Sequence, residues 1–478
     1  MQALRNRWAA EGGYREVLVI AIPLILSTGA WSVQHFVDRM FLTWYSPEAV
    51  AASMPAGILN FSIMSLFLGT ASYVSTFVAQ YYGAGRYHRI GPAIWQGIYV
   101  SVLGGLALIC LLPIASFIFD LVGHDPRVRV HEVVYFQILC IGGAPVIASS
   151  AMSGFFSGRG RPWPVMWVNM LSTAVNLIMD YALIFGRWGF PELGIMGAGI
   201  ATVLAGIFSF LAYLVLLSTR SNKETYHTEA GWKPERELFL RLLRFGFPSG
   251  VQFFLEMVGF TIFILLIGRL GTPSLAASNI AFNINTLAFM PMIGSGIAIS
   301  VLVGQYLGRD RPDLAQRSVY SGFHMTFIYM TSIATAYAFM PHIFVAPFAA
   351  YADPKAFAEV YRISVILLRF VAVYSVFDTM NIIFASAIKG AGDTRFVMFV
   401  ILIASVIVLI VPTYLALVIF GYGLMVSWVV VSAYVIILGF VFYFRFVGGR
   451  WKTMRVIEKP VVTLPPECSE CPEAKLKI

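Results

Sequence analysis

The sequence predicts an all-α integral membrane protein in which twelve transmembrane helices form two pseudo-symmetric bundles of six. Three observations support this prediction: the composition, the length of the apolar segments and an internal repeat. Of the 478 residues, 59% are hydrophobic and only 12% are charged, and the mean hydropathy is +0.78. A soluble domain averages roughly a quarter charged residues. The composition therefore excludes a soluble enzyme, a disordered chain and a fibrous repeat.

The apolar segments are continuous and have the length of membrane-spanning helices. The segment Val397–Phe420, for example, contains no charged residue, and about twenty apolar residues suffice to cross the hydrocarbon. Barrel strands would instead alternate apolar and polar residues over about ten positions. No cleavable signal peptide is expected at the N-terminus. The expected spans are 16–44, 49–82, 92–119, 132–157, 163–186, 194–217, 244–270, 276–307, 317–346, 358–388, 396–420 and 424–446.

The basic residues predict the orientation of these spans. Most of the 33 lysine and arginine residues lie in segments that share one side of the membrane. The positive-inside rule makes this side the cytoplasm and places both termini there. We expect a multi-pass protein of the cell inner (plasma) membrane. Its net charge of +9 fits contact with anionic membrane lipid, and we expect no nucleic-acid partner.

An internal repeat divides the chain into two halves. Several motifs recur at a constant offset of 225 residues, and a glycine motif recurs at 232. The recurring pairs are Pro23 and Pro248, Ser53 and Ser278, AQYYG (79–83) and GQYLG (304–308), Arg86 and Arg311, and Gly158 and Gly390. Six crossings return the chain to its starting side, so the halves are expected to be parallel repeats. The predicted organisation is an N-terminal bundle at 1–217, a cytoplasmic linker at 218–243, a C-terminal bundle at 244–446 and a cytoplasmic tail at 447–478.

Four acidic residues lie deep within the apolar spans, whereas the other acidic residues are assigned to loops, tails or helix ends. They are Asp38, Asp180, Glu256 and Asp378. A lone carboxylate in the bilayer interior costs a few kcal/mol. Each of the four must therefore face the protein interior, carry a proton or bind a cation, which makes all four candidates for an ion pathway.

Other oxygen-bearing side chains accompany the four acids. Asn176 and Asp180 are four residues apart and share one helix face, and Thr202 lies in the next span. With Asp38, they would form an oxygen-rich site that exchanges protons or binds one Na+ ion. In the second half, Tyr374 and Asp378 share a helix face, which Glu256 would approach from span seven. The alternative is that both sets are hydrogen-bonded clusters that only fix helix packing.

The prolines and cysteines predict less about the function than the acidic residues do. Pro23 and Pro248 lie in the first helix of each half, where each is expected to produce a kink. Cys110 and Cys140 lie within apolar spans, where they pack as small hydrophobic residues. The tail contains a lone CxxC pair, Cys468 and Cys471. One such pair cannot fill a four-ligand zinc site, and no role is assigned to it.

Several segments resemble the MATE (multidrug and toxic compound extrusion) transporters, and the resemblance extends to about residue 450. The matching segments are IPLILSTGAWSVQHFVDRMFL, VAQYYGAGR, VNMLSTAVNLIMDYALIFG, GIMGAGIATVLA, GQYLGRDR and VYSVFDTMNIIFASAIKGAGDTR. The resemblance implies a V-shaped pair of bundles around a central cavity. It also implies antiport by alternating access, in which cationic amphipathic drugs leave in exchange for Na+ or H+.

The resemblance also implies roles for individual residues. Asp38, Asn176, Asp180 and Thr202 match the family's cation or proton site in the N-terminal bundle. Glu256, Tyr374 and Asp378 match residues of the C-terminal bundle that are associated with the NorM-like branch. Having both sets favours that branch over the DinF-type branch.

Other functions have less support in the sequence. We find no Walker, HExxH or GxSxG motif that would supply enzymatic chemistry, and we expect no cofactor apart from the coupling ion. A flippase for lipid-linked oligosaccharides, from the related superfamily, is the main alternative, but its cavity would need basic side chains to hold pyrophosphate. A channel fits two repeated halves less well. The expected partners are small cationic drugs and membrane lipid, and the expected state is a monomer.

Overall fold

The computed structural model describes residues 7–122, 125–349 and 354–458. The CxxC pair of the tail, Cys468 and Cys471, lies outside the described residues. Helices before the linker are α2 (Tyr14–Tyr45), α3 (Pro47–Ser72), α4 (Val74–Gly83), α5 (Ile90–Ile109), α6 (Ala115–Val122), α7 (Pro126–Ile141), α8 (Gly143–Gly158), α9 (Trp163–Phe185) and α10 (Ile195–Leu217). Helices from the linker onward are α11 (Arg220–Tyr226), α12 (Arg236–Gly268), α13 (Thr272–Gly308), α14 (Pro312–Phe339), α15 (Pro341–Ala349), α16 (Pro354–Ala391), α17 (Thr394–Ala404), α18 (Val411–Tyr414) and α19 (Leu424–Val447).

The lengths of these helices confirm the predicted all-α membrane protein. Within the residues that the structure describes, ten helical segments are long and apolar enough to cross a membrane. Two further pairs, α7 with α8 and α14 with α15, are bent by 44° and 74°, and the number rises to twelve if each pair is one span. Several boundaries differ from the prediction. For example, α12 begins at Arg236, so the end of the expected linker forms the first turns of this helix.

Proline has different effects at different places in the fold. Pro23 and Pro248 lie inside α2 and α12, and both helices continue through them. Near Pro412, which lies in α18, the helix widens into π-helical segments at Ser405–Ile410 and Leu415–Ile419. Such wide turns accommodate an interruption of the usual hydrogen-bond ladder, and the sequence analysis did not predict them.

The two halves of the chain pack against each other reciprocally. We call α2–α10 the N-terminal group and α12–α19 the C-terminal group. The first helix of the N-terminal group, α2, packs on α13, and the first helix of the C-terminal group, α12, packs on α3. Each first helix thus contacts the second span of the other half. This exchange follows from the sequence repeat, because equivalent surfaces meet equivalent partners.

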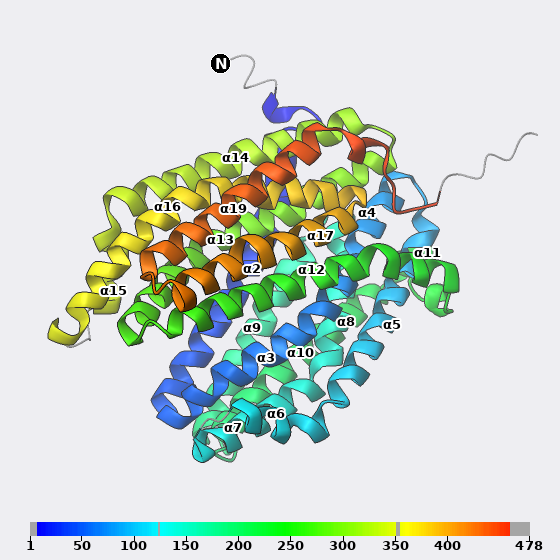
Figure 1. Ribbon diagram of the computed structural model, residues 1–478. Coiled ribbons are helices and arrows are strands. Elements are labelled where there is room, and N and C mark those ends of the chain that lie inside the picture. The colour runs from blue at the N-terminus through cyan, green and yellow to red at the C-terminus, as the bar shows by residue number, and fades with distance from the viewer. Residues whose placement is uncertain (1–6, 123–124, 350–353, 459–478) are drawn as a thin grey trace, which may run out of the picture.

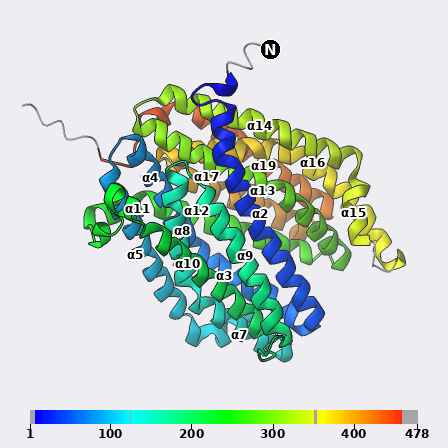
Figure 2. The same ribbon diagram turned by 180° about the vertical axis from the view of Figure 1, so that it is seen from behind.

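The groups are joined at one end and apart at the other (Figures 1 and 2). One hydrophobic core includes residues of both groups, among them Val17 of α2 and Leu302 of α13. Two other cores belong to one group each, one built around Trp428 and the other around Ile184. In both views α7 and α15 lie at the far tips of a V. We call the joined end, where α4 meets the last turns of α13, the closed end.

Candidate functional site

Two of the predicted carboxylates face each other in the N-terminal group. Asp38 lies on α2 and Asp180 on α9, and these helices pack together. The two carboxyl groups are close enough to interact directly. Asp180 and Asn176, one turn earlier on α9, are both 0% exposed. The structure therefore brings three of the four predicted residues of this set into one buried place.

The polar atoms of this place lack partners. One oxygen of Asp38, both oxygens of Asp180 and both polar atoms of the Asn176 amide have no hydrogen-bond partner. Two ionised carboxylates can only accept hydrogen bonds, so they cannot satisfy each other. A buried polar group without a partner costs about 1–3 kcal/mol, and more when it is charged. A shared proton or a bound cation would remove this cost.

Neighbouring side chains complete the surroundings of the carboxylate pair. Arg39 is the positive charge that acts on Asp38, and Tyr135 of α7 lies within electrostatic reach of both carboxylates. Thr202 lies on α10, which packs on α9, and its hydroxyl donates to the carbonyl of Ala198 at 3.0 Å. The sequence analysis missed Tyr135 because a tyrosine in an apolar span carries no distinctive signal.

The second predicted set is also brought together, with different surroundings. Glu256 of α12 and Asp378 of α16 interact electrostatically across the two helices. Each acid accepts a hydrogen bond from a nearby amide, Gln252 for Glu256 at 3.0 Å and Asn381 for Asp378 at 2.9 Å. The acids here are thus partly satisfied by neutral donors.

Two further residues surround this second set. Tyr374 accepts a hydrogen bond from Asn285 of α13 at 3.3 Å. Lys389, near the end of α16, is a positive charge within reach of Glu256. The sequence analysis assigned Lys389 to a loop, because the helix was expected to end one residue before it. The second set therefore has a basic neighbour that the prediction did not contain.

A fifth acidic side chain is buried that the sequence analysis assigned to a helix end. Glu132 of α7 is 0% exposed. Among the residues that the structure describes, no three His, Cys, Asp or Glu side chains are grouped as a metal site. A sodium ion at Asp38 and Asp180 would therefore need neutral oxygens, such as those of Asn176 or Thr202, to complete its ligands.

The closed end is built from the repeated glutamine motif. Gln80 of α4 donates to the carbonyl of Gly390 at 3.1 Å, and Gln305 of α13 donates to the carbonyl of Gly158 at 2.8 Å. Both bonds cross between the groups, and the four residues are the pairs that the sequence repeat relates. The repeat thus encodes two equivalent ties across the closed end.

Glycines let the backbones meet between these ties. A Cβ atom on Gly83 would lie 2.0 Å from the carbonyl oxygen of Gln305, and one on Gly308 would lie 2.3 Å from that of Gln80. Both distances are far below van der Waals contact, and the obstacle is backbone rather than a movable side chain. Only glycine at these two repeat-related positions permits the observed closure.

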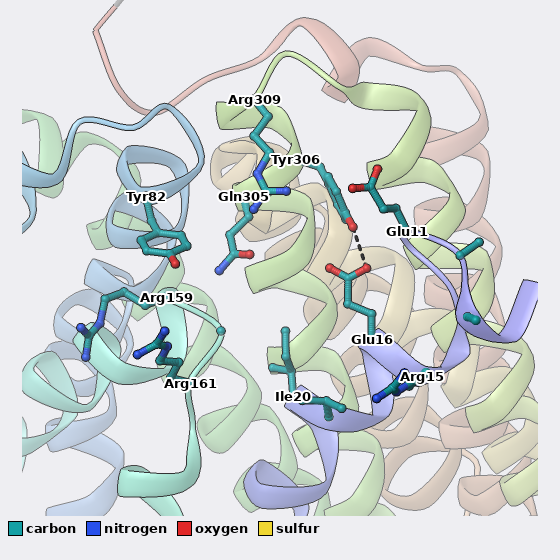
Figure 3. A pocket seen from close by; sticks show the side chains of 14 residues that line it. Glu11, Arg15, Glu16, Ile20, Tyr82, Arg159, Arg161, Gln305, Tyr306 and Arg309 are labelled. Atoms are coloured by element: carbon teal, nitrogen blue, oxygen red, sulfur yellow. Dashed lines mark hydrogen bonds between the residues drawn. The ribbon is translucent and has the colours of Figure 1, made fainter.

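A cavity of about 480 Å³ lies at this end, well away from the carboxylate sets. Figure 3 shows it between the start of α2, the Arg159–Arg161 turn and the last residues of α13. Tyr306 donates to a carboxylate oxygen of Glu16 at 2.6 Å across it. Its walls carry arginines as well as glutamates.

Replacing Gln80 with alanine is expected to loosen the closed end. The change removes the bond to Gly390 and also the acceptor of the Val456 N–H, which lies 2.8 Å from Oε1. Each loss is worth about 1 kcal/mol or more, so the backbone amide of Val456 should exchange with solvent about tenfold faster. Hydrogen exchange measured by mass spectrometry checks this. In the control Gln137→Ala, which breaks a bond to Leu112 within one group, the exchange of Val456 should be unchanged. If Val456 exchanges no faster in Gln80→Ala than in the wild type, the role of Gln80 at the closed end is contradicted.

Two related groups of spanning helices, joined at one end and carrying buried carboxylates, define a membrane transporter rather than an enzyme. Comparison with known proteins agrees. The model of the MatE family matches residues 23–182 and 248–415, more than half of the chain. The chain belongs to the MatE family.

Individual relatives and solved structures are similar over most of their length. A protein of Bradyrhizobium diazoefficiens named "Probable multidrug resistance protein NorM" is 29% identical, with 82% of this chain and 83% of the relative covered. A protein of the same name from Thermotoga maritima is 23% identical, over 93% and 94%. A MOP superfamily transporter from Pyrococcus furiosus, described as having a binding pocket of reverse polarity, superposes with a TM-score of 0.84 at 17% identity, over 94% and 98%. An outward-facing multidrug resistance MATE transporter superposes with a TM-score of 0.83 at 16% identity, over 93% and 98%.

Proposed function

We propose that the protein exports cationic, amphipathic small molecules in exchange for Na+ or H+, by alternating access. The observation that carries this proposal is the pair of Asp38 and Asp180, in which both oxygens of Asp180 and one oxygen of Asp38 are buried without a hydrogen-bond partner. The pair is complete only when it holds a proton or a cation. The names of the NorM relatives support multidrug compounds as the cargo.

The proposal assigns the moving parts to the predicted bundles, 1–217 and 244–446, connected by the linker at 218–243. The closed end carries basic segments, among them Arg86 and Arg311, and is placed at the cytoplasm by the positive-inside rule. The proposal puts the N-terminus and the tail at 447–478 on this same cytoplasmic side, in a protein of the cell inner membrane. The structure then corresponds to a state open to the outside, where the coupling ion enters.

Coupling follows from competition for negative charge. A cation or proton on Asp38 and Asp180 neutralises the pair, and a cargo cation gains less from a neutral site than from a charged one. An ion that binds one state better than the other shifts the equilibrium by that difference in affinity. The set at Glu256, Tyr374 and Asp378 would take part more weakly, because Lys389 and two amides already compensate its charges.

Aromatic rings offer a surface for the apolar part of the cargo. Trp31 of α2 packs on Phe61 of α3 with ring centroids 5.5 Å apart, and Phe61 contacts Phe253 of α12 at 5.8 Å. These rings belong to both groups, and Trp31 remains 43% exposed. It lies two helical turns from Asp38 along α2. Stacking and cation–π contact at such a surface suit a flat organic cation.

The test is ethidium transport by the purified protein in liposomes, with Na+ and pH gradients imposed separately. We expect export driven by one of the two gradients. This result would identify the coupling ion and exclude a flippase for lipid-linked oligosaccharides. Transport of a pyrophosphate-linked lipid without any ethidium transport would overturn the proposal.

Replacing Pro23 with alanine is expected to weaken coupling. Proline supplies no N–H to the carbonyl of Val19 in α2, which favours bending at this point. Alanine restores a hydrogen bond worth about 1 kcal/mol to the straight helix, so gradient-driven export should fall about fivefold while insertion is retained. Vesicle transport against the wild type measures the change; full coupled activity would remove Pro23 from the mechanism.

A further inference from the structure

The segment that follows the last spanning helix crosses to the opposite group. We call residues 454–458 the C-terminal strap; it follows α19 and the short helix Arg450–Thr453. Although α19 belongs to the C-terminal group, the strap runs beside α4 of the N-terminal group (Figure 1, red chain near α4). Val456 is only 1% exposed, so the strap is embedded rather than lying loose on the surface.

The strap is held first through its backbone. The N–H of Val456 donates to Oε1 of Gln80, while the amide nitrogen of the same Gln80 donates to Gly390. One glutamine side chain thus connects α4, the end of α16 and the strap. A Cβ atom on Gly392 would lie 2.9 Å from the Val456 side chain, which shows how closely the strap is packed.

The charged end of the strap is shared between the two groups. The Glu458 carboxylate accepts a hydrogen bond from the Tyr81 hydroxyl at 2.8 Å and lies 3.4 Å from Arg89, both in the N-terminal group. It also pairs with Arg241 of α12, in the C-terminal group, at 3.1 Å. In addition, Arg86 donates to the Glu458 backbone carbonyl at 2.9 Å. A single carboxylate therefore bridges the groups.

These surroundings keep Glu458 charged. Partial burial acts to raise the pKa of Glu458. Hydrogen bonds to its own backbone amide and to Tyr81, together with the charges of Arg89 and Arg241, outweigh burial and bring the pKa below its ordinary value. The carboxylate is 32% exposed and the facing Arg241 side chain is 23% exposed. Charge-assisted bonds that are partly shielded from solvent are stronger and less screened by salt than exposed pairs.

The sequence repeat gives this contact a counterpart. Tyr306, which the repeat relates to Tyr81, donates to Glu16 of α2 at 2.6 Å, again from one group to the other (Figure 3). In both halves the tyrosine of the repeated motif thus holds a glutamate of the other half. The two glutamates do not correspond within the repeat, since Glu16 lies in the first turn of the first spanning helix and Glu458 follows the last one.

We propose that the C-terminal strap holds the closed end shut, and that Glu458 must leave Tyr81 and Arg89 each time this end opens. Glu458 is then a positioning residue for the transport cycle, not a ligand for ion or cargo. This inference rests on the alternating access proposed above, because the strap has this role only if the closed end opens.

The experiment measures opening directly in the full chain. Spin labels are placed at Ser221→Cys in α11, which follows α10 of the N-terminal group, and at Asp313→Cys in α14 of the C-terminal group. Both positions are exposed, and the four native cysteines are first replaced with serine. Distances between the labels are recorded in liposomes under Na+ and pH gradients. The test variants are Glu458→Gln and Tyr81→Phe; Tyr81→Phe removes the hydrogen bond from the N-terminal group to Glu458 while leaving the strap sequence intact. The control is Arg455→Ala, which breaks an ion pair with Asp310 inside one group.

If the strap holds the closed end shut, both test variants raise the ratio of open to closed molecules about tenfold, as expected for loss of a charge-assisted bond. The control stays within about twofold of the wild type. If the wild type opens and both test variants match it, the proposed role of the strap is overturned while alternating access stands. If the wild type shows no opening under either gradient, the proposed function fails, and the proposed role of the strap fails with it.

Discussion

Asp180→Asn is expected to abolish gradient-driven export while the protein still folds and inserts. The asparagine keeps the shape of the side chain but can neither take up a proton nor hold a cation by charge. A charged hydrogen-bonding group contributes about 3 kcal/mol at most to such a site, and each 1.4 kcal/mol is a tenfold change. Export should therefore fall about 100-fold. The effect is large because Asp180 is completely buried and water cannot replace it.

Ethidium export from liposomes, at equal amounts of inserted protein, measures this effect. The matched control is Glu48→Gln, which makes the same kind of change at an exposed acid in the first turn of α3. The control should transport like the wild type. Export by Asp180→Asn within about threefold of the control would contradict a coupling role for the carboxylate pair.

Gly83→Ala is expected to prevent the closed end from closing. The new Cβ atom would lie 2.0 Å from the carbonyl oxygen of Gln305, and a backbone carbonyl cannot rotate away as a side chain can. The groups must then separate where Gln80 and Gln305 make their crossing bonds. Overpacking costs about 1–3 kcal/mol, so the closed state should become at least tenfold rarer and export should fall by about the same factor.

A second glycine provides the control for this prediction. Gly29 lies in α2, where an added Cβ atom would meet nothing within 4 Å, so Gly29→Ala should close and transport normally. The label distance across the closed end, measured as for the strap, distinguishes the two variants. A closed Gly83→Ala protein with normal export would show that the two backbones need not meet so closely.

Much of the fold could be predicted because the membrane restricts it. Long apolar runs such as Val397–Phe420 must be helical, and a repeat at one offset must give two related halves. The pairing of Asp38 with Asp180 was expected from one carboxylate in each of two spans. What the sequence could not supply was the bend between α7 and α8 and the burial of Glu132 on α7. Nothing in the residue pattern separates a bent span from a straight one.

Contacts between distant segments were also beyond the sequence analysis. The repeated glutamine motif was recognised as a repeat, but its bonds to Gly158 and Gly390 depend on how the halves meet. Likewise, Glu458 belongs to a segment treated as a cytoplasmic tail, and only the fold shows its ties to Tyr81 and Arg241. Lys389 was placed in a loop because the end of an apolar run is a poor guide to the end of a helix.

The central claim is that buried carboxylates link the ion gradient to export of the cargo. The most direct test is gradient-driven ethidium export by a protein in which Asp38, Asp180, Glu256 and Asp378 are all replaced with their neutral amides. The account predicts a correctly inserted protein that exports no ethidium under either gradient. Export at the wild-type rate by this fourfold variant would contradict it.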